Sequence, residues 1–318
     1  MFLGVDGGGT KTAFCLVTAD GGVAARAEEP TTYVAADVDR LIAVLHDGVS
    51  KVCAAAGVTT AELDRAFFGL PAYGESSVTK PLLDAAPRAV LGHDRYDCGN
   101  DMVCGWAGSL ATADGINVIS GTGSMAYGER HGSVARAGGW GELFGDEGSA
   151  HWIGLRGLAV FTRMSDGREP RGPLHQLLRE HLRLEQDLDV LDLVLHEWGG
   201  ERARVASVGP VVVRASEAGD RCAAQILAEA ATELVLVVDT VRRRLGFEDG
   251  EPVPVSYSGG VFGAAAVRDL FAKSLAAQTV AYELREPLYP PVIGAALYAA
   301  RQAGAPLDDA ALARLRGG

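Results

Sequence analysis

Residues 6–12 read Asp-Gly-Gly-Gly-Thr-Lys-Thr and join two strand-like segments. Adjacent glycines let backbone N–H groups approach an anion without interference from Cβ atoms, and Thr10 and Lys11 add a hydroxyl and a point charge. Asp6 would repel a bare phosphate, so its presence favours a Mg²⁺ ion, held through water, between them. An ordinary hairpin turn explains three glycines equally well. The candidate phosphate contacts are Gly8, Gly9, Thr10 and Lys11.

Residues 120–124, Ser-Gly-Thr-Gly-Ser, repeat this chemistry between two further strand-like segments. One such turn is weak evidence. Two turns far apart in the chain could hold the β- and γ-phosphates of a nucleotide from two sides. Neither turn matches the GxxxxGK[ST] or GxGxxG pattern, so P-loop and Rossmann folds are disfavoured. The candidate contacts here are Gly121, Thr122 and Gly123.

A third glycine pair, Gly259-Gly260, follows a predicted strand at 253–258. It precedes a helix-like segment, where the backbone could approach a flat ring such as adenine. A tightly packed turn between a strand and a helix would have the same composition.

Asn100-Asp101 stands at the start of a predicted helix. An aspartate there could merely stabilise the positive end of the helix, by roughly 0.3–1 kcal/mol. The functional interpretation makes Asp101 a general base that takes a proton from an attacking sugar hydroxyl, with Asn100 beside the same substrate.

Residues 138–149 form the segment richest in candidate ligand contacts. Trp140 stands between glycines and could lie flat against a sugar face, while Asp146 and Glu147 could accept hydrogen bonds from hydroxyls. Alternatively, both acids could serve only the helix that Ser149 is placed to cap. The candidate sugar contacts of this segment are Gly139, Trp140, Asp146 and Glu147.

Two β meanders, each bent around a glycine-rich turn, must position these residues, and they predict an internally duplicated α/β plan. We expect a first domain at 1–112 and a second at 113–318, with the helix near 292–303 packing back on the first. The predicted strands are 2–6, 12–18, 23–29, 65–70, 88–91, 116–120, 124–129 and 253–258, and the predicted helices include 38–56, 101–110, 223–245 and one beginning after Ser149.

Composition limits the partners. The net charge of −12 disfavours nucleic acid, and the single basic run, Arg242–Arg244, is best interpreted as the end of a helix. Five cysteines without CxxC spacing fit a reducing cytoplasm better than disulfides or structural zinc. A strand begins directly after Met1, so we expect no leader peptide, and no apolar run reaches the roughly 18 residues of a membrane span.

Together these segments resemble the N-acetylglucosamine kinase branch of the BadF/BadG/BcrA/BcrD ATPase family, within the actin/hsp70/hexokinase superfamily. The resemblance covers nearly the whole chain. The matching motifs are DGGGTKT at 6–12, ND at 100–101, SGTGS at 120–124, GGWGELFGDEGSAHWIG at 138–154 and SGGVF at 258–262.

The resemblance implies an α/β fold of two ribonuclease-H-like domains, each a mixed five-stranded sheet flanked by helices, with the active site in the cleft between them. It implies an ATP- and Mg²⁺-dependent cytoplasmic kinase that phosphorylates the 6-hydroxyl of an amino sugar, first of all N-acetylglucosamine. By the same resemblance Asp6 lies near Mg²⁺, Asp101 is the base, and Trp140 and Asp146 lie near the sugar. A homodimer is compatible with the sequence.

The chain departs from the family where these kinases commonly carry a sugar-binding Asn, because it has Pro30-Thr31-Thr32-Tyr33 there. Thr32 is our candidate for that position, and glucosamine, N-acetylmuramic acid and glucose remain alternative substrates. A sugar or nucleotide sensor without catalysis is an alternative of another class. So is an ATPase activator with a cysteine-ligated iron–sulfur cluster, although Cys98 and Cys104 lack the sequence context of that site.

Overall fold

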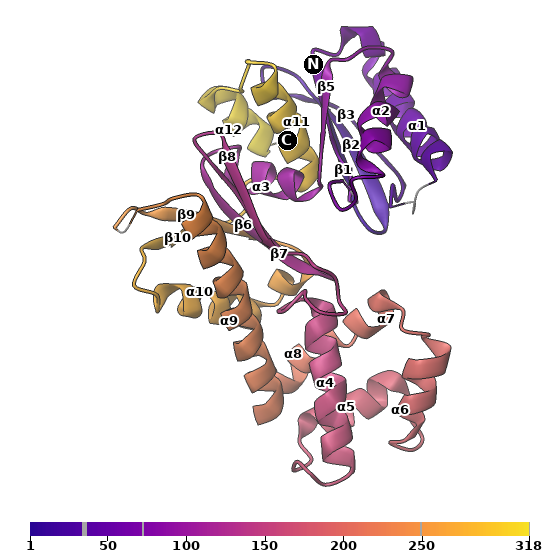
Figure 1. The fold of residues 1–318 in the computed structure, drawn as a ribbon, viewed down its shortest axis with the longest axis vertical. Helices are drawn as coiled ribbons and strands as arrows, with labels where there is room; N and C mark the ends of the chain where they lie inside the picture. Colours follow the sequence, from indigo (N-terminus) through magenta and orange to yellow (C-terminus); the bar gives the residue numbers. More distant parts are fainter. Residues whose placement is uncertain (34–36, 72, 249, 318) are drawn as a thin grey trace. The chain divides into compact units, whose positions relative to one another are not determined.

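The computed structural model describes residues 1–33, 37–71, 73–248 and 250–317. These residues form two compact units, one of residues 1–114 with 286–318 and the other of residues 115–285 (Figure 1). The sequence interpretation instead ended the first domain at 112 and gave 113–318 to the second. The residues from 286 onwards return to the first unit, where α11 (Pro291–Gln302) packs on β1 (Phe2–Gly7) and α3 (Met102–Leu110), as expected for the helix near 292–303.

The sheet of the first unit begins with an antiparallel meander of β1 (Phe2–Gly7), β2 (Lys11–Val17) and β3 (Val23–Pro30). Strands β4 (Arg65–Gly69) and β5 (Tyr96–Gly99) then add in parallel beside β1, giving the order β3-β2-β1-β4-β5. The sheet is therefore mixed and five-stranded, as predicted.

Alternating side chains of β2 explain why helices cover both faces of this sheet. Phe14 and Leu16 enter a cluster with α1 (Val38–Ala56), while Cys15 and Val17 enter another with α11. Figure 1 shows α1 and α11 on opposite sides of this sheet. The remaining elements of this unit are η1 (Thr60–Glu62), α2 (Lys80–Leu91), α3 (Met102–Leu110) and α12 (Asp309–Gly317).

Helices α3 and α11 pack with their backbones very close together. An ideal Cβ built on Gly294 of α11 would lie 2.2 Å from the backbone oxygen of Cys104 and 2.2 Å from the backbone nitrogen of Gly108, both in α3. Glycine therefore sets the spacing of this pair, and α3 begins directly after Asp101.

The second unit repeats the same sheet. Its meander is β6 (Gly115–Ser120), β7 (Ser124–Arg130) and β8 (Ser133–Gly138), and β9 (Val253–Ser258) and β10 (Tyr282–Leu284) add in parallel, giving β10-β9-β6-β7-β8. Helices α9 (Arg221–Arg244) and α10 (Ala265–Ala276) supply the hydrophobic residues that cover this sheet. The predicted duplication is confirmed, because both sheets have the same order of pairing.

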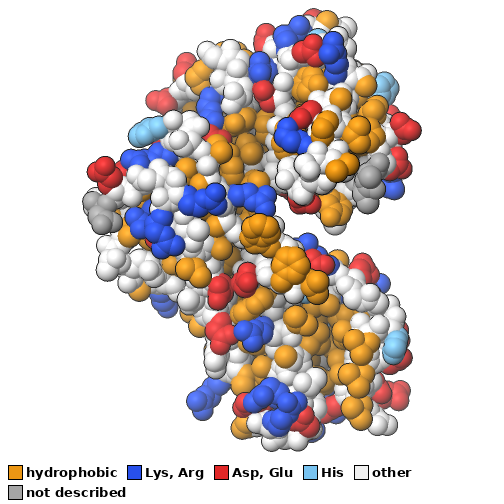
Figure 2. All heavy atoms as spheres, in the orientation of Figure 1, with side chains coloured by type: hydrophobic (Ala, Val, Ile, Leu, Met, Phe, Trp, Pro, Cys, Tyr) orange, Lys and Arg blue, Asp and Glu red, His pale blue; other side chains and the backbone are white. Residues whose placement is uncertain are grey.

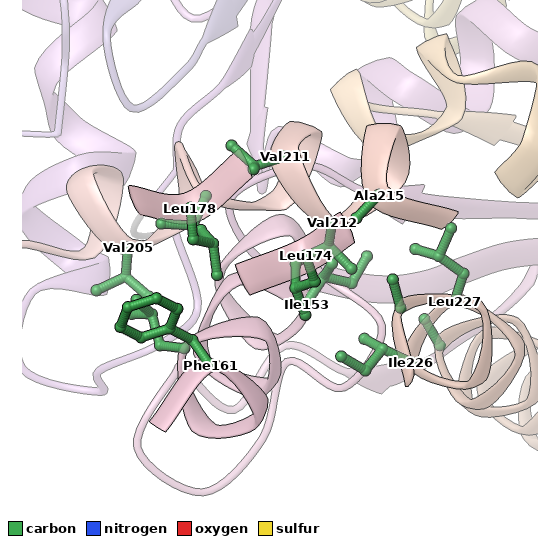
Figure 3. Packing of buried hydrophobic residues seen from close by; sticks show 14 of the residues in the cluster. Ile153, Phe161, Leu174, Leu178, Val205, Val211, Val212, Ala215, Ile226 and Leu227 are labelled. Atoms are coloured by element: carbon green, nitrogen blue, oxygen red, sulfur yellow. The ribbon is translucent and has the colours of Figure 1, made fainter. Parts of the chain in front are cut away.

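A helical layer extends the second unit beyond its sheet. It comprises α4 (Ala150–Ser165), α5 (Pro173–Leu182), α6 (Asp189–Asp192), η2 (Leu193–Glu197), α7 (Arg202–Ala206) and α8 (Gly209–Glu217). Side chains such as Ile153, Phe161, Leu174 and Val212 meet Ile226 and Leu227 of α9 in one buried cluster (Figure 3). This cluster fixes α4 and α7, which matters below because both helices flank the candidate site. The short η3 (Gly260–Gly263) follows β9.

Most predicted elements are confirmed, but the strand predicted at 88–91 is wrong. Those residues are the last turn of α2, which contains Pro87 and ends at Gly92 in the left-handed region. An apolar run as short as Ala89-Val90-Leu91 cannot distinguish a strand from a helical turn. The true strand β5 escaped prediction because Asp97 pairs with Arg65 on β4, so its sequence looks too polar.

Charged side chains of both signs lie among hydrophobic ones on the surface of each unit (Figure 2). The basic run Arg242–Arg244 lies in the last turn of α9, as predicted, and Arg242 and Arg243 pair there with Asp239. None of the helices in the described part of the chain is long and apolar enough to cross a membrane.

Candidate active site

Two carboxylates of the first unit lie close enough for the charge of Asp6 to raise the pKa of Asp101. Asp6 stands near the end of β1 and Asp101 directly before α3, and β4 lies between these two chain segments. An ideal Cβ on Gly69 of β4 would lie 3.3 Å from the Cα of Asp101 and 2.2 Å from the Sγ of Cys104. Only a glycine at this position allows the start of α3 to approach the sheet so closely.

Burial is the main cause of the unusual ionisation of this pair. It raises the pKa of Asp101 to about 7, with further increases from the charges of Asp6 and Glu75. It also raises the pKa of Asp6 to about 6, against the opposing effects of a hydrogen bond with Cys104 and the charge of Lys11. A carboxyl that titrates near neutral pH suits a general base, because it accepts a proton and releases it again at that pH.

Asp101 directly precedes α3 without forming a side-chain cap of the usual kind, and the backbone N–H of Met102 donates a hydrogen bond to its carboxylate. This bond is compatible both with stabilisation of the helix end and with a role as a base. The neighbouring residue Asn100 is buried, and its side chain holds the backbone around Asp101 in place through three hydrogen bonds. The Asn100 side-chain amide donates to the backbone oxygens of Pro71 at 3.0 Å and Tyr73 at 3.3 Å, and its oxygen accepts from the backbone of Met102 at 3.2 Å. Asn100 therefore fixes the turn that presents Asp101.

The first glycine turn is a short hairpin closed by a hydrogen bond of 2.8 Å from the backbone N–H of Gly8 to the backbone oxygen of Lys11. Thr31 supports the turn from β3's end, since its hydroxyl donates to the Gly8 oxygen at 2.6 Å. Gly9 and Thr10 are exposed. The Lys11 ammonium pairs with Glu28 on β3.

Thr32, our candidate for the sugar-binding position, is buried beneath this turn. Its backbone N–H donates to the Thr12 hydroxyl at 3.0 Å, and the two hydroxyls lie 3.3 Å apart. Its hydroxyl would also lie 2.4 Å from a Cβ on Gly7. The structure thus gives Thr32 a part in supporting the hairpin, while Tyr33 beside it is exposed.

Three segments of the second unit that the sequence analysis selected independently lie in direct contact. An ideal Cβ on Gly259 would lie 2.3 Å from the backbone oxygen of Ser120, so the third glycine motif contacts the second glycine turn. The Gly121 oxygen accepts a hydrogen bond of 2.8 Å from the backbone of Ala150. Hydroxyls of the same turn, Ser120 and Ser124, donate to the backbone oxygens of Gly148 and Glu147 at 2.8 and 2.6 Å.

The segment 138–149 presents one aromatic ring to solvent and buries one carboxylate. Trp140 is 70% exposed, whereas Asp146 is 3% exposed and has a left-handed backbone with φ of 57°. Glu147 is half-buried. Gly139, at φ of 70°, packs on Met125. Ser149 caps α4 by accepting a hydrogen bond of 3.1 Å from the backbone N–H of Trp152, as predicted.

The glycines of these motifs are of two kinds. Gly69 and Gly259 are required by the fold, because an ideal Cβ would collide with the buried Sγ of Cys104 or with the backbone of Ser120, whereas a Cβ on Gly123 would meet the side-chain ends of Arg202 and Asp146. In contrast, an ideal Cβ on Gly9, Gly121 or Gly260 would meet no atom within 4 Å, and none of these three has a left-handed backbone. The fold does not explain glycine at these three positions, whereas a ligand that approaches the backbone does.

Sequence reasoning missed several residues of these clusters. Arg202 forms ion pairs with Asp146 and Glu142. The thiol of Cys104 forms a hydrogen bond with Asp6, and the charge of Glu75 raises the pKa of Asp101. No motif marks any of them, because each reaches its partner through the fold from a distant part of the sequence. Arg202 stands 56 residues after Asp146.

Asp6 has the chemistry that a magnesium site needs, although it supplies only one ligand. Within the described residues, no group of three or more His, Cys, Asp or Glu side chains could hold a metal ion by itself. Magnesium is often bound by one or two carboxylates together with substrate phosphates and waters. Burial raises the pKa of Asp6 because neither Lys11 nor Cys104 fully offsets the cost of its negative charge. A cation bound beside Asp6 would offset that cost.

Two sheets of identical order, each with a glycine turn at its first hairpin, define the actin/hexokinase type of architecture. Residues 3–299 match the model of the BadF/BadG/BcrA/BcrD ATPase family, and the chain belongs to this family.

The chain is also similar in sequence to two kinases from other organisms. The chain is 29% identical to an N-acetyl-D-glucosamine kinase of Dictyostelium discoideum, over 94% of this chain and 97% of that protein. It is 30% identical to an N-acetylmuramic acid/N-acetylglucosamine kinase of Clostridium acetobutylicum, over 81% of this chain and 84% of the relative.

Solved structures show the same fold. A candidate N-acetylglucosamine kinase of Chromobacterium violaceum superposes with a TM-score of 0.71 at 26% identity, covering 93% of this chain and 98% of the other. A ROK family glucokinase of Streptomyces griseus, solved with glucose and AMPPNP, superposes with a TM-score of 0.56 at 17% identity, covering 95% of this chain and 99% of the other, and supports the fold alone.

Proposed function

We propose that this chain is an ATP-dependent sugar kinase that transfers the γ-phosphate of ATP to the hydroxymethyl oxygen of an amino sugar, first of all N-acetylglucosamine. Membership of the family and the names of two relatives support the kinase class and the amino sugar. The structural observation that carries the proposal is the half-buried carboxylate of Asp101, which lies near Asp6 and whose pKa is raised to about 7.

In this proposal the first unit contributes the base and the first phosphate turn. Asp101 accepts the proton of the acceptor hydroxyl, and that oxygen attacks the γ-phosphorus while the bond to the β-phosphate oxygen breaks. The products are the phosphorylated sugar, ADP and one proton, which leaves Asp101 to solvent. The exposed backbone around Gly9 contacts the phosphates.

The second unit contributes the second phosphate turn, with Gly121, Thr122 and Gly123, and a surface for adenosine at Gly259 and Gly260. The contact between Gly259 and Ser120 supports a shared nucleotide surface. Trp140 stacks on the sugar face, since its ring is largely exposed and its backbone stands among glycines. Asp146 orients sugar hydroxyls.

Mg²⁺ fits this proposal at Asp6, through water, with ATP phosphates as the other ligands. When bound, Mg²⁺ neutralises phosphate charge during transfer. Asp6 would hold it, and Lys11 would add a further positive charge at the same turn.

The test is an assay of ADP release with ATP and one sugar at a time. We expect turnover with at least one of N-acetylglucosamine, glucosamine, N-acetylmuramic acid and glucose, and Asp101→Asn should reduce kcat by about 10²- to 10⁴-fold. Asp47→Asn, at an exposed position of α1, is the matched control and should retain full activity. Tight binding of sugar and nucleotide without any turnover would favour the sensor alternative instead.

A second experiment tests the first phosphate turn separately from catalysis. Gly9→Val adds a side chain where the free protein has open space, so the Tm should stay at the wild-type value while ATP affinity falls by roughly tenfold or more. Gly317→Val, also beside open space but at the end of α12, is the control. An unchanged ATP affinity in Gly9→Val would mean that the hairpin is only a turn.

A further inference from the structure

Arg202 is a residue of the second unit that no motif includes, and it lies at the centre of an ionic cluster. Its Nη2 atom bonds to Asp146 Oδ2, and its Nη1 atom lies 3.4 Å from Glu142 Oε2. Its buried Nε atom has no hydrogen-bond partner among the described residues. One guanidinium therefore faces two carboxylates of the segment 138–149.

This ion pair lies directly against the second phosphate turn. An ideal Cβ on Gly123 would lie 2.2 Å from Arg202 Nη2 and 2.8 Å from Asp146 Oδ2. The glycine thus lets the backbone of the turn touch both charged groups. Any anion held by that turn would feel both charges at short range.

Asp146 needs a positive partner at this position for two reasons. Its side chain is 3% exposed, and a buried carboxylate without a cation is strongly unfavourable. In addition, an unpaired negative charge beside Gly123 would repel a phosphate. Both effects are opposed by the guanidinium of Arg202.

The fold holds Arg202 in this position through packing of its helix. An ideal Cβ on Gly154 of α4 would lie 2.2 Å from the backbone oxygen of Val205 in α7. Val205 and Ala206 are buried, and Val205 belongs to the hydrophobic cluster of the helical layer (Figure 3). The charge of Arg202 is therefore delivered to the turn by the packing of α7 on α4.

We infer that Arg202 is a positioning residue which neutralises Asp146 beside the second phosphate turn, so that a sugar-binding carboxylate and a nucleotide polyphosphate can occupy neighbouring positions. The inference rests on the proposed function and deepens it. Two nitrogen atoms of Arg202 already face carboxylates, which favours neutralisation of Asp146 over direct binding of phosphate.

A double-mutant cycle separates these two roles. Titration calorimetry measures the Kd of AMPPNP without sugar for the wild type, Arg202→Met, Asp146→Asn and the double variant. We expect roughly tenfold or more weakening in Arg202→Met, no weakening in Asp146→Asn, and an affinity close to wild type in the double variant, because both charges are then removed. An unpaired Asp146 would also destabilise the fold of Arg202→Met, so the Tm of each variant is measured beside its Kd and the Kd values are compared at a temperature where all four proteins are folded.

Two controls keep the interpretation clear. Arg204→Met removes an exposed neighbour in the same helix, whose partner is Glu201 at 3.3 Å, and should leave the Kd unchanged. Arg202→Lys keeps the charge and should recover part of the affinity. If Arg202→Met does not fold, the Kd of the double variant is compared with that of the wild type. The double variant should fold, because Asp146→Asn removes the carboxylate that Arg202→Met leaves unpaired.

The inference fails if the double variant binds AMPPNP as weakly as Arg202→Met, which would show direct contact of Arg202 with phosphate. It also fails if Arg202→Met binds like the wild type. Failure of the wild type to bind AMPPNP at all would instead overturn the proposed function.

Discussion

Asp101→Asn should make the protein more stable while abolishing its proposed activity. The reason lies in the raised pKa of Asp101, which changes from 3.8 to about 7 on folding. The folded state holds this proton more tightly than the unfolded chain, so stability falls as pH rises from about 4 to about 7. Above pH 7 the ionised carboxylate remains in an unfavourable environment.

The size of the effect follows from the shift. At about 1.4 kcal/mol for each pH unit, moving the pKa from 3.8 to about 7 costs the folded state at most about 4 kcal/mol. Asp101 is partly exposed, and solvent reduces this cost, so we expect a gain of about 1–3 kcal/mol in Asp101→Asn at pH 8. The backbone N–H of Met102 donates a hydrogen bond to Asp101. The side-chain oxygen of an asparagine can accept the same bond.

Urea denaturation of both proteins at pH 4 and pH 8 measures this gain. The difference between variant and wild type should be small at pH 4, where Asp101 is protonated, and should reach its full value at pH 8. At pH 8 the Tm should rise by roughly 2–8 °C. Asp47→Asn serves as the control for loss of an exposed charge and should show no such pH dependence. Equal stability of Asp101→Asn and the wild type at pH 8 would refute the reasoning.

Two further predictions concern the same unit. The value of kcat/KM for the acceptor sugar should rise with pH and level off above about 7, because Asp101 must be ionised to accept a proton; a pH–rate profile that is flat from pH 5 to 8 would contradict this. Gly294→Ala should destabilise the protein by roughly 3 kcal/mol, since the added Cβ would collide with backbone atoms of α3, which cannot yield as a flexible side chain can. Thermal unfolding compares it with Gly317→Ala, which adds a methyl group in open space, and equal losses in both would disprove the packing argument.

Much of this protein could be predicted from local patterns in the sequence. Apolar residues at three- and four-residue steps located α1 with the bounds that the structure has, and Gly57 ends it in the left-handed region. The glycine turns located both hairpins, and Ser149 caps α4 as expected. These features succeed because hydrogen bonds and side-chain periodicity act between residues close in sequence.

Local patterns failed where a partner from another segment decides the outcome. The strand β5 contains Asp97, which pairs with Arg65 on the neighbouring strand β4, and this partner cannot be recognised from the local sequence. Thr32 stays a candidate ligand contact, and the structure adds that its hydroxyl accepts a hydrogen bond of 3.3 Å from Thr12. A hydroxyl gives no sign in the sequence of whether its partner is the protein or a ligand.

The sequence by itself determined the duplicated sheets, the three glycine motifs and the acidic residues available for chemistry. Only the tertiary structure decided how those residues ionise and what neutralises them. The pKa of Asp101 depends on its burial and on Asp6, which lies 95 residues earlier in the chain, and Arg202 reaches Asp146 through the packing of α7 on α4. Electrostatic energies depend on distance and exposure in space, which no local pattern of residues specifies.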